Sequence, residues 1–119
     1  MELIQLPMHS DERGDLTVLE NQIPFSVKRI FWITNSNATR GGHRHIETQQ
    51  ALCCLSGKCA VHINDGIKQS VQTLASPREI LLVEPHEWHT MQFYDKSTVL
   101  LVLASHAYNK ADYIYDPYD

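Results

Sequence analysis

Short runs of hydrophobic residues recur along the chain, and turn-forming residues separate them. Such runs are typical of β-strands, and no segment keeps a helical period over three turns. A short helical turn near Asn109–Tyr113 is the best helical candidate. The pattern predicts strands at Leu3–Leu6, Leu16–Glu20, Val27–Thr34, Thr48–Leu55, Lys58–Ile63, Lys68–Leu74, Ile80–Val83, Thr90–Phe93 and Val99–Ala104.

Two turn signals lie between these strands. Leu55-Ser56-Gly57-Lys58 and Asn64-Asp65-Gly66 both predict β-hairpins, and the second contains the Asp-Gly pair that such turns prefer. The segment from Thr34 to Thr39 is expected to be a polar loop. Many short strands at this spacing predict an all-β sandwich or barrel.

Length and charge narrow the functional classes. The chain has 119 residues, so a single domain covering residues 1–119 is expected. The formal net charge is −4 and no basic run is present, so we expect no nucleic-acid partner. A sugar nucleotide is compatible with this charge, because one or two well-placed arginines suffice to bind a diphosphate.

The first residues, the apolar runs and the cysteines indicate where in the cell the protein is expected. The first residues lack the features of a signal peptide, and the runs Ile80–Val83 and Val99–Ala104 are too short to cross a membrane. Cys53, Cys54 and Cys59 are odd in number, and two of them are adjacent in an apolar strand. This pattern favours buried, reduced thiols. We therefore expect a cytoplasmic protein without a membrane partner.

Two histidine-containing segments carry the candidate chemistry. In Gly42-His43-Arg44-His45 the two histidines are one residue apart, so on a strand they share a face. Pro85-His86-Glu87-Trp88-His89 supplies a third histidine. Histidine is both a common metal ligand and an acid or base near neutral pH, so the residues alone are compatible with either chemistry.

A face of the strand predicted at Val27–Thr34 adds an arginine. Val27, Arg29, Phe31 and Ile33 alternate onto one side of this strand. Because burying an unpaired charge is costly, Arg29 is expected either to line a polar cavity that binds an anion or to lie at the rim beside a carboxylate.

The two histidine segments resemble the two motifs of the cupin superfamily of small β-barrels. Metal-binding cupins carry a glutamate after the His-x-His pair, and this chain has Gln50 at that position, followed by Gly57. An amide is a weaker ligand for a transition metal than a carboxylate. A site of His43, His45 and His89 with water stays open, but a metal-free site with no cofactor is favoured.

Within this superfamily the chain resembles the dTDP-4-keto-6-deoxyglucose 3,4-ketoisomerases, a WxcM-like group. The resemblance extends over nearly the whole sequence. It is carried by the segments Asp11–Leu16, Ile23–Arg29, Arg40–His45, Gln50–Gly57, Pro85–His89, Val102–Ser105 and Asp112–Ile114.

The resemblance implies an RmlC-like jelly-roll barrel and a homodimer with strands shared between subunits. It implies conversion of a dTDP-linked 4-keto-6-deoxyhexose to the 3-keto sugar through an enediol, in deoxysugar biosynthesis for surface glycans such as the O-antigen of lipopolysaccharide. His43 and His45 then occupy the catalytic positions, and no metal is required.

The resemblance also implies that Arg13 lies near the sugar nucleotide, at the diphosphate. Arg29, Phe31, Gln50 and His89 are further candidate substrate-binding residues. The family usually has a tyrosine where this chain has Phe31, which cannot hydrogen-bond a sugar oxygen. This difference is compatible with altered stereochemistry, another substrate, or loss of catalysis.

Three other functions stay open on the sequence. A related sugar-nucleotide epimerase would use the same base beside a ketone. A metal-dependent cupin enzyme would use the three histidines as ligands. A non-catalytic sugar-nucleotide-binding cupin is the reading that Phe31 favours most.

Overall fold

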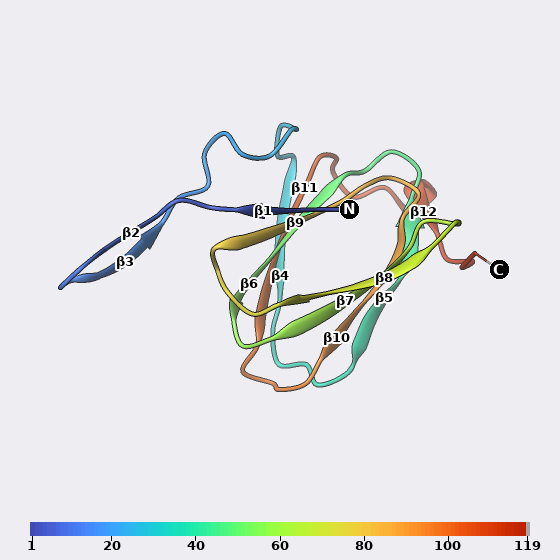
Figure 1. Ribbon diagram of the computed structural model, residues 1–119. Coiled ribbons are helices and arrows are strands. Elements are labelled where there is room, and N and C mark those ends of the chain that lie inside the picture. The colour runs from blue at the N-terminus through green and yellow to red at the C-terminus, as the bar shows by residue number, and fades with distance from the viewer. Residues whose placement is uncertain (119) are drawn as a thin grey trace.

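Two five-stranded antiparallel sheets face each other and form the barrel (Figure 1). The computed structural model of the protein describes residues 1–118. In spatial order, the first sheet contains β1 (Glu2–Gln5), β9 (Glu79–Val83), β6 (Gln50–Ser56), β11 (Val99–Ala104) and β4 (Arg29–Ile33). The second contains β12 (Tyr113–Ile114), β5 (Thr39–His45), β10 (Trp88–Phe93), β7 (Cys59–Asn64) and β8 (Gln69–Leu74).

The core lies between the two sheets. Alternate side chains of β10, namely His89, Met91 and Phe93, are buried, as expected for a strand with one face toward a core. Strand β6 is buried on both faces, because a second apolar cluster covers the outside of the first sheet. This second cluster includes Leu6 and Leu82, so the N-terminal segment packs against the outer face of that sheet.

The two predicted hairpins have different outcomes. Asn64-Asp65-Gly66 does join paired strands, β7 and β8, and the Asp65 carboxylate accepts hydrogen bonds from the backbone N–H groups of Ile67 and Lys68. The prediction at Leu55–Lys58 was wrong, because β6 and β7 belong to different sheets. Gly57 instead makes a corner of the barrel, with φ of 79° and no room for a side chain beside Thr98.

Several predicted boundaries also differ. The strand predicted at Leu16–Glu20 is β3 (Gly14–Thr17), which pairs with β2 (Met8–Asp11), a polar strand that hydrophobic patterning missed. The predicted polar loop ends before Thr39, because β5 already begins at that residue. The helical turn expected near Asn109–Tyr113 is a 3₁₀ helix, Lys110–Asp112, in which the Asn109 side chain caps the Ala111 N–H group.

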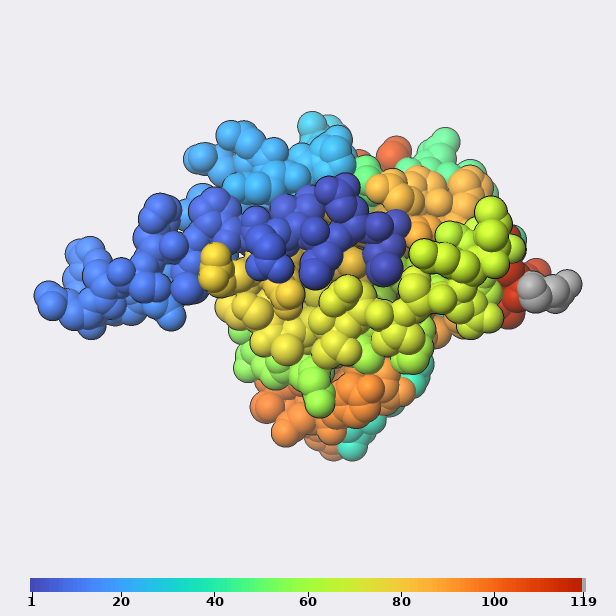
Figure 2. Space-filling model, in the orientation of Figure 1, coloured from blue at the N-terminus to red at the C-terminus, as the bar shows by residue number. Residues whose placement is uncertain are grey.

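The β2–β3 hairpin extends away from the barrel (Figures 1 and 2). Its strands pair only with each other, and Leu16 on β3 is 63% exposed. An isolated two-stranded hairpin is only marginally stable in water, so this segment lacks the packing that the rest of the fold has.

Two further observations concern the three cysteines and the absence of a membrane-spanning helix among residues 1–118. Cys53, Cys54 and Cys59 are free and buried, as predicted. Among residues 1–118, the structure contains no helix of the length and apolarity needed to cross a membrane.

Candidate active site

Three histidines meet inside one end of the barrel. His43 and His45 come from β5, and His89 comes from the neighbouring β10, where it lies opposite His43. The His43 ring centroid is 5.0 Å from that of His45 and 5.0 Å from that of His89. The structure therefore brings together the two histidine segments that the sequence singled out.

A local irregularity in β5 sets this alignment. Gly41 and Gly42 have φ of 88° and 83°, and the pairing with β10 shifts register between His89 and Thr90. A side chain at position 41 would approach the His89 carbonyl oxygen at 3.0 Å. Glycines are needed here because other residues rarely adopt this backbone conformation, and the bulge they allow turns His43 toward His89.

His45 is held by a buried carboxylate. Its Nδ1 atom lies 2.9 Å from Oδ2 of Asp112. The same carboxylate accepts hydrogen bonds from the Thr48 hydroxyl at 2.5 Å and from the Glu47 N–H group at 2.7 Å. A carboxylate only accepts, so Nδ1 of His45 carries the proton and Nε2 keeps its lone pair. Within residues 1–118, this buried Nε2 atom has no hydrogen-bond partner.

Two of the three histidines line a cavity of about 270 Å³, whereas His45 lies behind them, 5.0 Å from His43 between ring centroids, and is not among the lining residues. His43 and His89 line the cavity together with three other predicted site residues, Arg29, Phe31 and Gln50. The remaining lining residues are Trp32, Ile33, Arg40, Gly41, Leu52, Met91, Val102 and Tyr113. The lining therefore combines apolar side chains with polar groups, which are arginines, histidines, an amide and a phenol.

Of the two positions expected for Arg29, the structure shows the one in which it lines the cavity. Its guanidinium lies over the Phe31 ring at 4.4 Å and over the Tyr108 ring at 5.2 Å. Its Nη1 atom donates a hydrogen bond to the Tyr113 hydroxyl at 3.3 Å. No carboxylate among residues 1–118 forms an ion pair with it. A positive charge without a paired carboxylate suits an anionic ligand.

The surroundings keep the histidines neutral. Burial lowers the pKa of His43 to about 3, helped by the neighbouring His89 and His45. Burial likewise lowers the pKa of His89 to about 4. Burial also lowers the pKa of His45, but its hydrogen bond to Asp112 and the charge of that carboxylate oppose the change. Of the three histidines, His45 is therefore the one whose protonated form is best stabilised, because Asp112 lies beside it.

Asp112 stays ionised beside His45. Burial raises the pKa of its carboxyl group, but the hydrogen bonds from Thr48, Glu47 and His45 together lower it further, and the net result lies below its ordinary value. Within residues 1–118, no group of three His, Cys, Asp or Glu side chains has the arrangement of a metal site.

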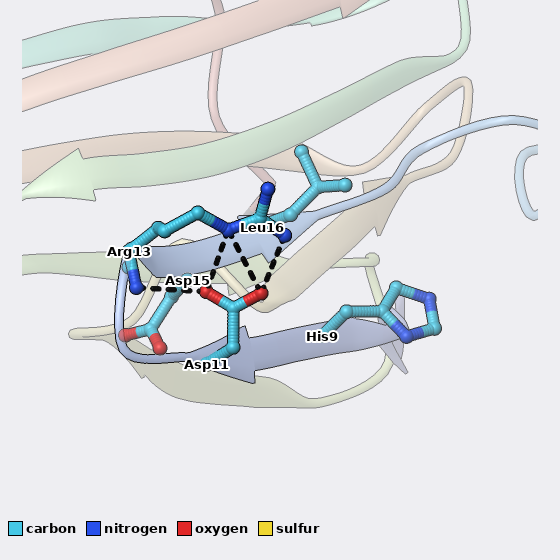
Figure 3. Close-up of a pocket in the computed structure, with 6 residues that line it drawn as sticks. His9, Asp11, Arg13, Asp15 and Leu16 are labelled. Atoms are coloured by element: carbon cyan, nitrogen blue, oxygen red, sulfur yellow. Dashed lines mark hydrogen bonds and ion pairs between the residues drawn. The ribbon is translucent and has the colours of Figure 1, made fainter.

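Arg13 lies elsewhere. It is on the projecting β2–β3 hairpin, where Figure 3 shows its guanidinium and its N–H group bonded to the Asp11 carboxylate. These two residues line a separate depression on the hairpin with His9, Asp15 and Leu16. In one copy of the chain, Arg13 is thus not among the residues that line the histidine cavity. Its substrate-binding role stays a prediction.

Sequence reasoning missed three residues of the site, namely Arg40, Asp112 and Tyr113. Asp112 is the last residue of the short 3₁₀ helix, and Tyr113, which follows it, pairs with His45 in the ladder between β12 and β5. Both belong to a segment that the family resemblance includes, but no spacing rule connects them to the histidines. The available signal was chemical, because a histidine acting as a base needs a partner for its other nitrogen.

Comparisons with known proteins found a matching family and a curated relative. The family model described as "FdtA: WxcM-like, C-terminal" matches residues 1–119. A protein of Aneurinibacillus thermoaerophilus, named TDP-4-oxo-6-deoxy-alpha-D-glucose-3,4-oxoisomerase, is 42% identical over 108 residues, which cover 87% of this chain and 78% of that protein.

Among solved structures, one group resembles this chain in both sequence and fold, and another resembles it in fold alone. A mutant of the 3,4-ketoisomerase QdtA from Thermoanaerobacterium thermosaccharolyticum, in complex with TDP-4-keto-6-deoxyglucose, is 34% identical with a TM-score of 0.92, covering 97% of this chain and 86% of that one. The 3,5-epimerase RmlC of Legionella pneumophila, at 12% identity and a TM-score of 0.80, covers 93% of this chain and 69% of its own. The second likeness concerns the fold alone and confirms the predicted RmlC-like barrel.

Proposed function

The chain belongs to the FdtA (WxcM-like, C-terminal) family, and we propose that it is a sugar-nucleotide 3,4-ketoisomerase. Its substrate is dTDP-4-keto-6-deoxyglucose and its product a dTDP-3-keto-6-deoxyhexose. The names of the 42% identical relative and of the QdtA complex support this activity. One observation carries the proposal. His43 lines the cavity next to His45, and the Asp112 carboxylate fixes the tautomer of His45.

The reaction moves a proton between adjacent carbons, C3 and C4, through an enediol. A base removes the C3 proton, and the same pair of histidines returns a proton to C4. His43 lines the cavity and is neutral, so it can contact the sugar without a competing charge. His45 supports the positive charge that arises on proton uptake, because the Asp112 carboxylate is 2.9 Å from its Nδ1 atom.

The other cavity residues bind and orient the substrate. Arg29 and Arg40 supply positive charge for the diphosphate or the carbonyl oxygen. Gln50 and His89 are buried, and their polar atoms suit the sugar hydroxyls. Phe31 contributes an apolar surface that holds the Arg29 guanidinium in place.

A homodimer explains the projecting hairpin. In this proposal β2–β3 of one copy lies on the barrel of the second copy and brings Arg13 toward the second cavity. The exposed Leu16 on the hairpin and Trp32 on β4, which is 64% exposed, are the apolar surfaces that such an association would cover. Light scattering of the purified protein should give twice the monomer mass of 13.7 kDa. Arg13→Ala should weaken TDP binding, whereas Arg78→Ala, on the exposed surface, should not.

The setting of the reaction follows from the same assignment. We place the enzyme in the cytoplasm, where three free, buried cysteines stay reduced. Its product would serve deoxysugar biosynthesis for surface glycans, including the O-antigen of lipopolysaccharide.

Proton NMR of dTDP-4-keto-6-deoxyglucose with the protein in D₂O tests the activity. We expect signals of a 3-keto product with deuterium at C4, and the ring couplings will give its stereochemistry. Turnover should persist in the presence of a chelator. Loss of turnover on chelation, restored by one metal, would contradict the metal-free mechanism.

The same spectra separate the alternatives. Deuterium incorporation at C5 would indicate a 3,5-epimerase. Line broadening without any change of the sugar signals would indicate a protein that binds but does not catalyse, and Phe31→Tyr would then be the next variant to examine.

A further inference from the structure

The ring of Tyr113 lies beside two of the three histidines, and its hydroxyl group contacts Arg29. Its ring centroid lies 4.8 Å from that of His43 and 4.5 Å from that of His45. Tyr113 lines the cavity, and its hydroxyl oxygen accepts a hydrogen bond from Nη1 of Arg29. Among the described residues that line the cavity, no other side chain carries a hydroxyl group.

The proposed isomerisation requires more than the transfer of a proton from C3 to C4, because protons must also move at the two neighbouring oxygens. When the C3–H bond breaks and its electrons form the C3=C4 double bond, the C4 carbonyl oxygen becomes negative and must receive a proton. When C4 is protonated later, the C3 hydroxyl must lose its proton to become the ketone. One proton therefore leaves O3 and one arrives at O4, beside the transfer from C3 to C4 that the histidines perform.

We propose that Tyr113 is a catalytic residue that carries this oxygen-bound proton. This inference rests on the proposed ketoisomerase function. The phenol donates its proton to O4 as the C3–H bond breaks, which leaves a phenolate and the neutral enediol. The phenolate then takes the proton of O3 as C4 accepts its proton, and the phenol is restored. Because O3 and O4 are on adjacent carbons, one hydroxyl group can serve both.

Arg29 is placed to support the phenolate. Its guanidinium already donates to the Tyr113 oxygen at 3.3 Å, so a negative charge formed there gains a charge-assisted hydrogen bond. The Phe31 and Tyr108 rings hold the guanidinium in position. Phe31 itself has no hydroxyl group, so it cannot share the role of Tyr113.

The test compares Tyr113→Phe with the matched variant Tyr115→Phe. The Tyr115 ring is stacked on Tyr113 with centroids 6.1 Å apart, but it is 61% exposed and does not line the cavity. Both variants remove one hydroxyl from neighbouring aromatic residues. Turnover of dTDP-4-keto-6-deoxyglucose is measured by NMR, and the affinity for TDP by calorimetry.

We expect Tyr113→Phe to lower kcat by about 10²-fold or more, the contribution of one positioned acid or base. KM and the Kd for TDP should change by less than about threefold, because the variant keeps the contacts that bind the substrate before the reaction. Tyr115→Phe should keep the wild-type kcat. A purely structural role of Tyr113 would instead change KM, Kd or the melting temperature.

The outcomes separate this inference from the function on which it rests. Wild-type turnover together with an unchanged kcat in Tyr113→Phe would refute the role of Tyr113 and leave the ketoisomerase standing. An equal loss in the two variants would also refute it. Absence of turnover in the wild-type protein would overturn the ketoisomerase itself, and the role of Tyr113 with it.

Discussion

Replacing Asp112 by asparagine should disable His45 while leaving the fold in place. In the wild-type protein Oδ1 of Asp112 accepts from the Glu47 N–H group, and Oδ2 accepts from Thr48 and from Nδ1 of His45. If the asparagine oxygen keeps the bond to Glu47, its NH₂ group faces Nδ1 of His45. Two donors then oppose each other, and His45 relieves this by moving its proton to Nε2. His45 then no longer has a free lone pair at Nε2 with which to take up a proton.

The size of the effect follows from the geometry. A hydrogen bond to a charged group contributes about 1.5–3 kcal/mol. If that amount is lost where the His45 imidazolium forms, the rate falls by about 10- to 150-fold, since each 1.4 kcal/mol is a factor of ten. The change of tautomer adds to this loss. The free energy of unfolding should fall by about 1–3 kcal/mol, because the buried Thr48 hydroxyl also loses its charged partner.

The assay is turnover of dTDP-4-keto-6-deoxyglucose by Asp112→Asn, with Asp116→Asn on the exposed C-terminal segment as the matched control. A calorimetric Kd for TDP and a melting curve establish that the variant is folded and binds. We expect a kcat loss of about 10² or more with near-normal TDP binding, because Asp112 positions His45 and does not line the cavity. A wild-type kcat in Asp112→Asn would refute the assignment of the Asp112–His45 pair.

Two further outcomes follow from the same structure. Because burial lowers the pKa of His43 to about 3 and lowers that of His45 below its ordinary 6.5, both histidines stay neutral at neutral pH. The value of kcat/KM should therefore stay level from about pH 8 down to about pH 6.5 and decline only at lower pH, and a decline centred above pH 6.5 would contradict these environments. Gly57→Ala should lower the free energy of unfolding by about 1–3 kcal/mol in urea titrations, because the new methyl group meets buried Thr98 at a positive φ. Gly14→Ala, also at positive φ but with open space around it, should cost less, and equal losses would show that the contact with Thr98 is unimportant.

Local patterns in the sequence determined much of this protein. Hydrophobic runs and turn residues indicated most strands and the β7–β8 hairpin, because alternation with period two is a property of each strand alone. The His-x-His spacing placed two histidines on one face for the same reason. The alternation of Val27–Ile33 also indicated that Arg29 and Phe31 share a face, and the structure places both at the cavity.

Tertiary structure decided what local patterns could not. The turn at Gly57 has the sequence of a hairpin, but the strands on either side of it belong to different sheets, so it makes a corner of the barrel next to Thr98. Strand β2 is polar, so its pairing with β3 leaves little hydrophobic signal. The carboxylate of Asp112 reaches His45 from 67 residues away in the chain. Long-range pairs of this kind depend on where the barrel closes, and the sequence near either residue does not encode that position.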